Sequence, residues 1–185
     1  MEFTTKCPFC GNLNVQTKSR QSYHFKESGL DNVYLKNVET YHCPDCHANM
    51  VSIPHSAQLL NCLGEAIVFS PGLLTGPEIR FLRKNLRIKI NDFAKLLRVS
   101  RVTVSRWENG QDITKPIDLL IRSIYLLKGP GINEKTRDAF RNWLEKQVVE
   151  KRRAKRRKRI EIPFPLDQFS CIPATAYAQK TSLTA

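Results

Sequence analysis

Four cysteines in two matched pairs have the spacing of a metal site. Each pair has the form Cys-Pro-x-Cys, and 32 residues separate the two pairs. Two residues between cysteines let a tight turn point both thiolates at one ion, and two such turns complete a tetrahedral shell of four sulfurs. The pattern therefore predicts one structural Zn²⁺ per chain, bound by Cys7, Cys10, Cys43 and Cys46.

Other uses of these cysteines fit the pattern less well. A redox dithiol normally has a single CxxC pair that opens a helix after a strand, so two pairs argue against it. Iron also accepts four thiolates and stays an alternative metal. A shell of four sulfurs leaves no position for water or substrate. The sequence also has no nucleophile–base set, no phosphate-binding loop and no catalytic histidine spacing. We therefore expect that the protein is not an enzyme.

The charge of the chain is unevenly distributed. Residues 1–70 carry 5 Lys/Arg and 6 Asp/Glu, a net charge of −1, whereas residues 71–185 carry 25 and 11, a net charge of +14. This contrast indicates two modules, of which the second faces a polyanion, most simply nucleic acid; a solvated basic surface is the alternative. No apolar run approaches the roughly 20 residues of a membrane span, and no secretory signal is evident. We therefore expect a cytoplasmic protein with no membrane association.

A short helix with two chemically distinct faces is predicted within "SRVTVSRWENG", residues 100–110. At 100° per residue, one side carries two arginines, a valine and a serine, and the opposite side offers Val104 and Trp107 to a core. Arginine pairs bidentately with guanine, valine packs on a thymine methyl, and hydroxyl and amide groups donate to phosphates. The predicted DNA-contacting residues are Ser100, Arg101, Val102, Thr103, Ser105, Arg106 and Asn109.

Two further helices are expected before this one. Thr75 and Glu78 have the spacing of a capping box, and a helix should run through residues 77–86. A second helix fits residues 91–98, with Phe93, Ala94 and Leu97 facing inward, and Ser100 should cap the third. The arrangement predicts a helix-turn-helix that presents its third helix to DNA.

Residues 75–110 resemble the helix-turn-helix of the Cro/434-repressor class, most specifically at "VSRVTVSRWENG". The order of modules, C-x₂-C…C-x₂-C followed by this motif, is similar to the MqsA (YgiT-type) antitoxin family over roughly residues 5–127. The resemblance implies a structural zinc on the four cysteines and a zinc domain that binds an mRNA-cleaving ribonuclease toxin. It also implies a homodimeric helix-turn-helix that represses its own operon at a palindrome in double-stranded DNA.

Three positions depart from the pattern of these relatives. Arg106 matches a base-reading arginine of the antitoxins, but Val102 stands where they carry asparagine, so the base code must differ. Ile90 replaces the glutamine that often begins the second helix, which removes one usual DNA contact. Arg98 replaces the glycine usual in the turn and implies a positive φ or a different turn.

The fold class expected from these patterns is α+β with two domains. A small zinc-stabilised, β-rich N-terminal domain precedes an all-α helix-turn-helix domain with a basic C-terminal extension. A connecting helix within residues 56–70 should bury Ala57, Leu60, Leu63 and Ile67. A helix at 115–128 has Ile117, Leu120, Ile121, Ile124 and Leu127 at helical spacing, and each of these residues either packs in the core or forms part of a symmetric dimer surface. The predicted boundaries are 1–55 for the zinc domain, 56–74 for the connector, 75–129 for the helix-turn-helix and dimerisation domain, 130–150 for an additional helix, and 151–185 for a basic run ("KRRAKRRKR", 151–159) and disordered tail.

Together these features predict a zinc-stabilised, DNA-binding transcriptional repressor, and the resemblance makes it the antitoxin of a type II toxin–antitoxin module. A stand-alone regulator, for example of a mobile element, would have the same sequence features. A protein-interaction adaptor, in which the zinc domain binds a partner and the helix-turn-helix only dimerises, is the alternative from a different class.

Overall fold

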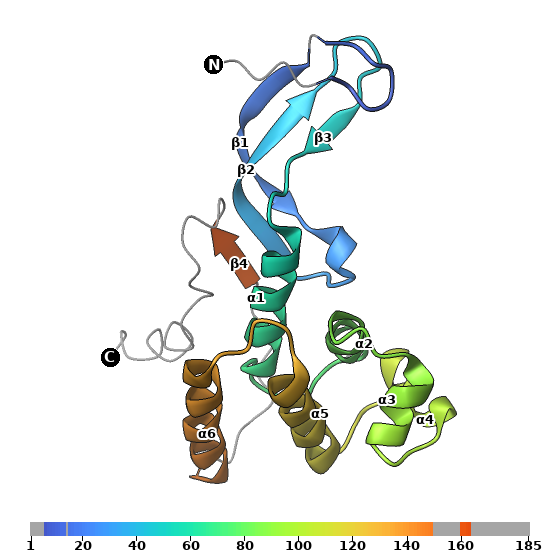
Figure 1. Cartoon of the computed structure of the whole chain (residues 1–185), viewed down its shortest axis with the longest axis vertical. Helices are drawn as coiled ribbons and strands as arrows, with labels where there is room; N and C mark the ends of the chain where they lie inside the picture. Colours follow the sequence, from blue (N-terminus) through green and yellow to red (C-terminus); the bar gives the residue numbers. More distant parts are fainter. Residues whose placement is uncertain (1–5, 14, 150–159, 164–185) are drawn as a thin grey trace.

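The computed structural model describes residues 6–13, 15–149 and 160–163. Figure 1 shows an elongated molecule in which a β-sheet projects away from a group of helices, and helix α1 (Ser56–Val68) runs between the two. The loops that hold the cysteine pairs lie at the end of the sheet farthest from the helices. The α+β class predicted from the sequence is confirmed, with a small antiparallel sheet followed by a helical domain.

The sheet is organised around its second strand. Strands β1 (Gln16–His24), β2 (Val33–His42) and β3 (Asn49–Val51) form an antiparallel sheet in the order β1-β2-β3, and a 3₁₀ turn, η1 (Lys26–Ser28), lies between β1 and β2. Val33, Leu35 and Val38 of β2 are buried. Register shifts between β1 and β2 and a positive φ at Asn37 interrupt the regular ladder.

A fourth strand, β4 (Ile160–Pro163), pairs in parallel with residues 33–36 of β2. The expectation of a tail without regular structure is therefore wrong for these four residues. β3 pairs with β2 only at residues 40–42, so the edge of β2 at 33–36 still offers unpaired backbone groups that another strand satisfies. The remaining residues of the predicted basic run and tail lie outside the described part of the chain.

Helix α1 is more deeply buried than a connecting helix would be. Leu63 and Ile67 are fully buried as predicted, but Ala57 is exposed and Leu60 only half-buried, so the predicted apolar face is partly wrong. From Cys62 to Val68 every side of the helix is covered. The reason is that α1 packs into one core shared by the sheet and the other helices. Gly64 permits this packing, because a Cβ there would overlap the hydroxyl of Tyr125.

The helix-turn-helix consists of α2 (Gly76–Asn85), α3 (Ile90–Leu96) and α4 (Arg101–Glu108). The predicted capping box is present: the N–H of Thr75 donates to Glu78 Oε2 at 2.8 Å, and the Thr75 side chain accepts from the N–H of Glu78. Ile79 and Leu82 are fully buried. Phe93, Ala94 and Leu97 are also buried, with no more than 3% of their surface exposed. Leu86, which follows α2, is half-buried.

Two more helices complete the group, α5 (Lys115–Lys128) and α6 (Glu134–Val149). Asn133 caps α6 by accepting from the N–H of Thr136 at 2.9 Å, as predicted. Of the apolar residues at helical spacing in α5, Ile121 and Ile124 are buried, whereas Leu120 and Leu127 are 40% and 73% exposed. Its inward face instead carries Asp118, Ile121, Arg122 and Tyr125, at the i, i+3, i+4, i+7 spacing of a helix face.

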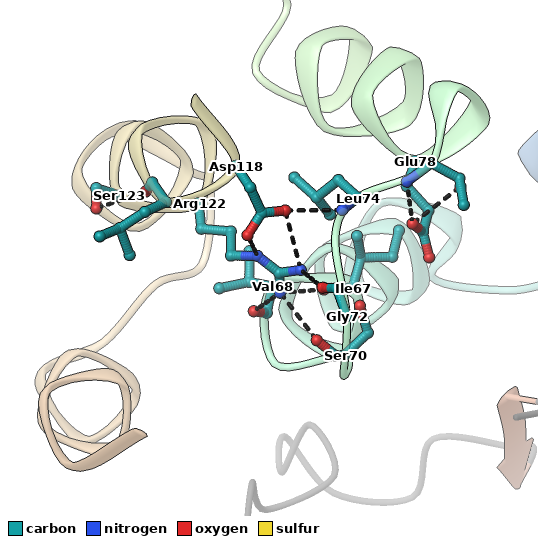
Figure 2. Close-up of polar contacts among 11 residues, drawn as sticks. Ile67, Val68, Ser70, Gly72, Leu74, Glu78, Asp118, Arg122 and Ser123 are labelled. Carbon is teal, nitrogen blue, oxygen red and sulfur yellow. Dashed lines mark hydrogen bonds and ion pairs between the residues drawn. The ribbon is translucent and has the colours of Figure 1, made fainter. Parts of the chain in front are cut away.

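Arg122 explains why a charged pair lies on that inward face. Its guanidinium forms two hydrogen bonds with Asp118, of 2.9 and 3.2 Å, and donates to the carbonyls at the end of α1 and just after it (Figure 2). Those carbonyls belong to Ile67, Val68, Ser70 and Gly72. The last carbonyls of a helix have no partner within the helix, and Arg122 supplies a buried donor to them, in addition to the N–H of Ser70 that donates to Ile67 O at 3.0 Å. Burial of this cation is therefore a consequence of where α1 ends.

Candidate metal centre and nucleic-acid interface

The four predicted metal ligands meet at the tip of the sheet. Their sulfur atoms all lie within 4.8 Å of one another, with Cys7 and Cys46 separated by 3.6 Å and Cys10 and Cys43 by 3.4 Å. A tetrahedral ion with Zn–S bonds of about 2.3 Å holds its sulfurs about 3.8 Å apart. The arrangement therefore fits a metal ion of this size and ligand preference, consistent with zinc.

The two cysteine turns have matching backbones. The N–H of Cys7 donates to Asn12 O at 2.7 Å, and the N–H of Cys43 donates to Ala48 O at 3.0 Å, five residues on in both cases. The residue after the second cysteine has a positive φ in both turns, +79° at Gly11 and +57° at His47. Glycine tolerates this conformation, whereas histidine is strained by it, and the repetition indicates that the geometry of the turn requires it.

The thiols differ in their affinity for protons. The N–H of Cys10 donates to the sulfur of Cys7 and is the main reason that the pKa of Cys7 falls to about 6. At Cys10 the N–H of Asn12 lowers the pKa, but contact with the Cys43 sulfur, burial and contact with the other two sulfurs together outweigh it, and the pKa rises to about 12. A metal ion binds thiolates, so it displaces the remaining protons when it binds, and affinity should increase with pH.

Helix α4 has the two faces predicted from its sequence. Val104 is fully buried and Trp107 is 7% exposed, whereas Val102 is 57% exposed. Arg101 and Arg106 are exposed beside Val102, and Ser105 lies half-buried on the same side. We call these four residues, Arg101, Val102, Ser105 and Arg106, the outer face of α4. The helix is anchored through one side while the outer face is open to a ligand.

Both ends of α4 are fixed by hydrogen bonds. The Ser100 side chain accepts from the N–H of Thr103 at 3.0 Å, which confirms the predicted cap. After Asn109, Gly110 has a φ of +105°, and the N–H groups of Gly110 and Gln111 return to carbonyls of Trp107 and Arg106. Ser100, Thr103 and Asn109 lie near the two ends of α4, where their side chains can reach phosphates. Contact between these residues and phosphates stays a prediction.

An ion-pair network that the sequence pattern did not indicate holds α4 against α2. Glu108 is buried and accepts from Arg83 at 2.6 and 3.0 Å, while Arg80 reaches Glu108 at 3.4 Å and the Asn109 side-chain oxygen at 2.9 Å. Gly76 allows the close approach, because a Cβ there would lie 2.6 Å from the carbonyl oxygen of Trp107. Two arginines three residues apart on α2, opposite a glutamate at the end of α4, were the available signal.

The departures from related helix-turn-helix sequences have visible consequences. Arg98 has a φ of +54°, so the chain keeps the left-handed turn and places arginine in it. Arg87, in the turn between α2 and α3, has a φ of +56°. Both residues end a helix through the same hydrogen-bond pattern, with the N–H of Arg98 and of Val99 donating to Lys95 and Ala94.

Comparison with known proteins supports the second module. Residues 79–121 match the family described as Helix-turn-helix, and this range contains most of α2, all of α3 and α4, and the first half of α5. The match supports a DNA-binding transcriptional regulator. No curated protein and no solved structure matched the chain. Among the described residues, no helix is long and apolar enough to cross a membrane.

Proposed function

We propose that this protein is a sequence-specific transcriptional repressor rather than an enzyme, and that it binds DNA as a homodimer through the outer face of α4. The observation that supports this most directly is the separation of the two faces of α4, with Val104 and Trp107 in the core and Arg101 and Arg106 exposed. A homodimer matches a palindromic operator, because each protomer binds one half-site. The cytoplasm is the proposed site of action.

Selection of bound duplexes from a random DNA pool tests this proposal. A palindromic motif is expected, and Arg106→Ala should weaken binding to it by about 1–3 kcal/mol, or roughly 5- to 150-fold, and relax the preference at one base pair. Arg141→Ala is a matched control, because Arg141 is an exposed arginine on α6 that pairs only locally with Asp138. Recovery of no motif would exclude this function, whereas equal binding by Arg106→Ala and the wild type would remove Arg106 from the residues that contact bases.

We further propose that the zinc domain binds a protein partner, and that the partner is the ribonuclease toxin of a type II toxin–antitoxin module. Phe9 and Leu13 support partner binding, because they are 74% and 59% exposed on and just after the first cysteine turn. The order of modules supports the toxin as that partner. Co-expression with the product of the adjacent gene should relieve its toxicity, and Phe9→Ser should abolish the relief while DNA binding is kept.

The result of that experiment also separates the alternatives. A stand-alone regulator would bind DNA equally well but rescue no toxic neighbour. An adaptor would keep partner binding and recover no DNA motif. The exposed apolar pair Phe9 and Leu13 favours a protein partner, as the antitoxin and the adaptor both need, whereas the exposed arginines of α4 favour DNA, as the antitoxin and the stand-alone regulator both need.

A further inference from the structure

A groove lined by cations lies beside the helix-turn-helix, outside the outer face of α4. It is bordered by the turn between α2 and α3, by the exposed side of α3 and by the end of α5. Two apolar side chains, Ile88 and Leu96, also line it. Its polar lining contains five cations and one carboxylate. We call this surface the cationic groove, and its charged residues are Arg87, Lys89, Asp92, Lys95, Arg98 and Lys128.

The backbone fixes the positions of the two arginines. Arg87 and Arg98 both have left-handed φ values, a conformation that costs a residue with a Cβ roughly 1–2 kcal/mol. The turn that carries Arg87 is also fixed by a side chain of α2, because Arg83 Nη1 donates to Ile88 O at 3.1 Å. The two arginines therefore extend from turns whose backbone is hydrogen-bonded to the preceding helix, which reduces the entropy lost when they order around a ligand.

Favourable interactions with helix dipoles account for only part of the positive charge in the groove. Arg87, Arg98 and Lys128 each lie at the C-terminal end of a helix, where a cation interacts favourably with the helix dipole. Each helix end contributes about half a negative charge, so three ends offset about 1.5 of the net charge of +4. Asp92 pairs with Lys95 at 3.7 Å and is already counted in that net charge. An excess of positive charge faces solvent.

The groove begins next to the proposed DNA-binding helix. Arg98 precedes by two residues Ser100, the cap of α4, and Arg101 begins the outer face of that helix. Helix α3, with seven residues, is about 10 Å long. Consecutive phosphates of one DNA strand advance about 3.4 Å along the duplex axis, so the groove has room for at least two of them.

We propose that the cationic groove binds phosphate groups, and that these are backbone phosphates flanking the bases contacted by α4. This inference rests on the proposed DNA binding by α4. Phosphates bound here would add affinity and fix the register of α4 without adding base preference. A free phosphorylated ligand has the same chemistry and is the other source of such groups.

Salt dependence of DNA binding tests the proposal. Binding of the full chain to the selected duplex with long flanks is measured by fluorescence anisotropy from about 50 to 200 mM KCl. Arg87→Gly/Arg98→Gly should reduce the magnitude of the slope of log K against log[KCl] by about 2. The loss of affinity relative to the wild type should therefore shrink roughly tenfold between the lowest and the highest salt concentration. The recovered DNA motif should stay the same. Asp92→Asn should act in the opposite direction and tighten binding.

Two controls exclude trivial causes. Lys26→Gln/Lys84→Gln removes the same charge from exposed positions outside the groove and should leave the slope close to that of the wild type. The glycine variant relieves two left-handed arginines, so its thermal stability should equal or exceed that of the wild type, and weakened binding will not reflect unfolding.

A second arm separates the sources of phosphate. Pyrophosphate is titrated into the DNA-free protein, and backbone NMR shifts at residues 87–98 are followed. Shifts there with an unchanged DNA slope would show that the groove takes a free phosphorylated ligand and would overturn the DNA half of the proposal. An unchanged slope with no shifts would overturn the whole proposal. A lost base preference in Arg106→Ala with an unchanged groove slope would leave the function of α4 intact and reject the groove alone.

Discussion

Replacement of Arg122 by methionine should destabilise the whole described fold. The side chain is fully buried, forms two hydrogen bonds with Asp118 and donates to four carbonyls at the end of α1 and just after it (Figure 2). Its guanidinium carbon lies 5.3 Å from the centre of the Trp143 ring. Methionine keeps much of the volume but leaves Asp118 buried without its cation. Breaking a buried pair in this way costs about 3–5 kcal/mol, and the loss of the hydrogen bonds to the carbonyls adds to that.

The expected loss is a large share of the total stability. A domain of this kind has a free energy of unfolding of about 5–15 kcal/mol, so a loss of about 4 kcal/mol is severe. With an m-value near 2 kcal/mol/M, the urea midpoint should fall by about 2 M, as followed by circular dichroism at 222 nm. Asp118 also accepts from the N–H of Leu74 at 2.7 Å, so the segment between α1 and α2 should loosen as well.

Companion variants decide whether the ion pair is the cause. Arg137→Met is the matched control, because Arg137 pairs with Glu134 at 3.0 Å on the surface of α6, where such pairs contribute about 0–1 kcal/mol. Asp118→Leu/Arg122→Met should lose less stability than the sum of the single variants, since it leaves no charge unpaired. A midpoint shift below about 0.5 M for Arg122→Met, or additive single effects, would refute the reasoning.

Three further predictions follow from single sites. Burial raises the pKa of the Glu65 carboxyl above its usual value of 4.5, so the folded state binds the proton more tightly and stability is lost as pH rises through the raised pKa. Glu65→Gln removes this loss, and its melting temperature relative to the wild type should increase between about pH 4 and pH 7; a constant difference would contradict the assignment. Gly64→Ala should cost about 1–3 kcal/mol in chemical denaturation, because the new methyl group displaces the Tyr125 hydroxyl from the Asn85 amide, which now donates to it at 2.7 Å. Purified protein should contain one zinc ion per chain by elemental analysis, and Cys43→Ser or a strong chelator should lower the melting temperature; an unchanged temperature with the zinc removed would show that the metal does not stabilise the fold.

Local sequence signals predicted the helix-turn-helix well. The capping box at Thr75, the cap at Ser100 and the two faces of α4 depend on residues three or four positions apart, so the sequence contains all the information they need. The four-cysteine cluster was equally predictable, because the chemistry of one ion requires the two pairs to meet.

Features that depend on contacts between distant segments were missed. Apolar periodicity grouped Leu127 of α5 with Ile121 and Ile124 on one face, whereas the helix is turned so that Arg122 lies inside and Leu127 is exposed. Nothing within α5 indicates that the carbonyls ending α1, more than 50 positions away, need a donor. The pairing of β4 with β2 was missed for the same reason, since a four-residue strand is specified by the edge it meets rather than by its own pattern.

The same contacts change how the net charge of +13 should be interpreted. Arg83 and Arg122 form their ion pairs inside the fold. Each pairs with a buried carboxylate and donates to at least one backbone carbonyl oxygen near the end of a helix (Figure 2 for Arg122). Their positive charge is therefore largely neutralised before DNA approaches. The arginines of the outer face and the cationic groove have no carboxylate of this kind within the described contacts, except for the exposed Asp92. Binding to DNA should accordingly be sensitive to those exposed residues, while substitution of Arg83 or Arg122 should act through stability, and total charge alone distinguishes neither group.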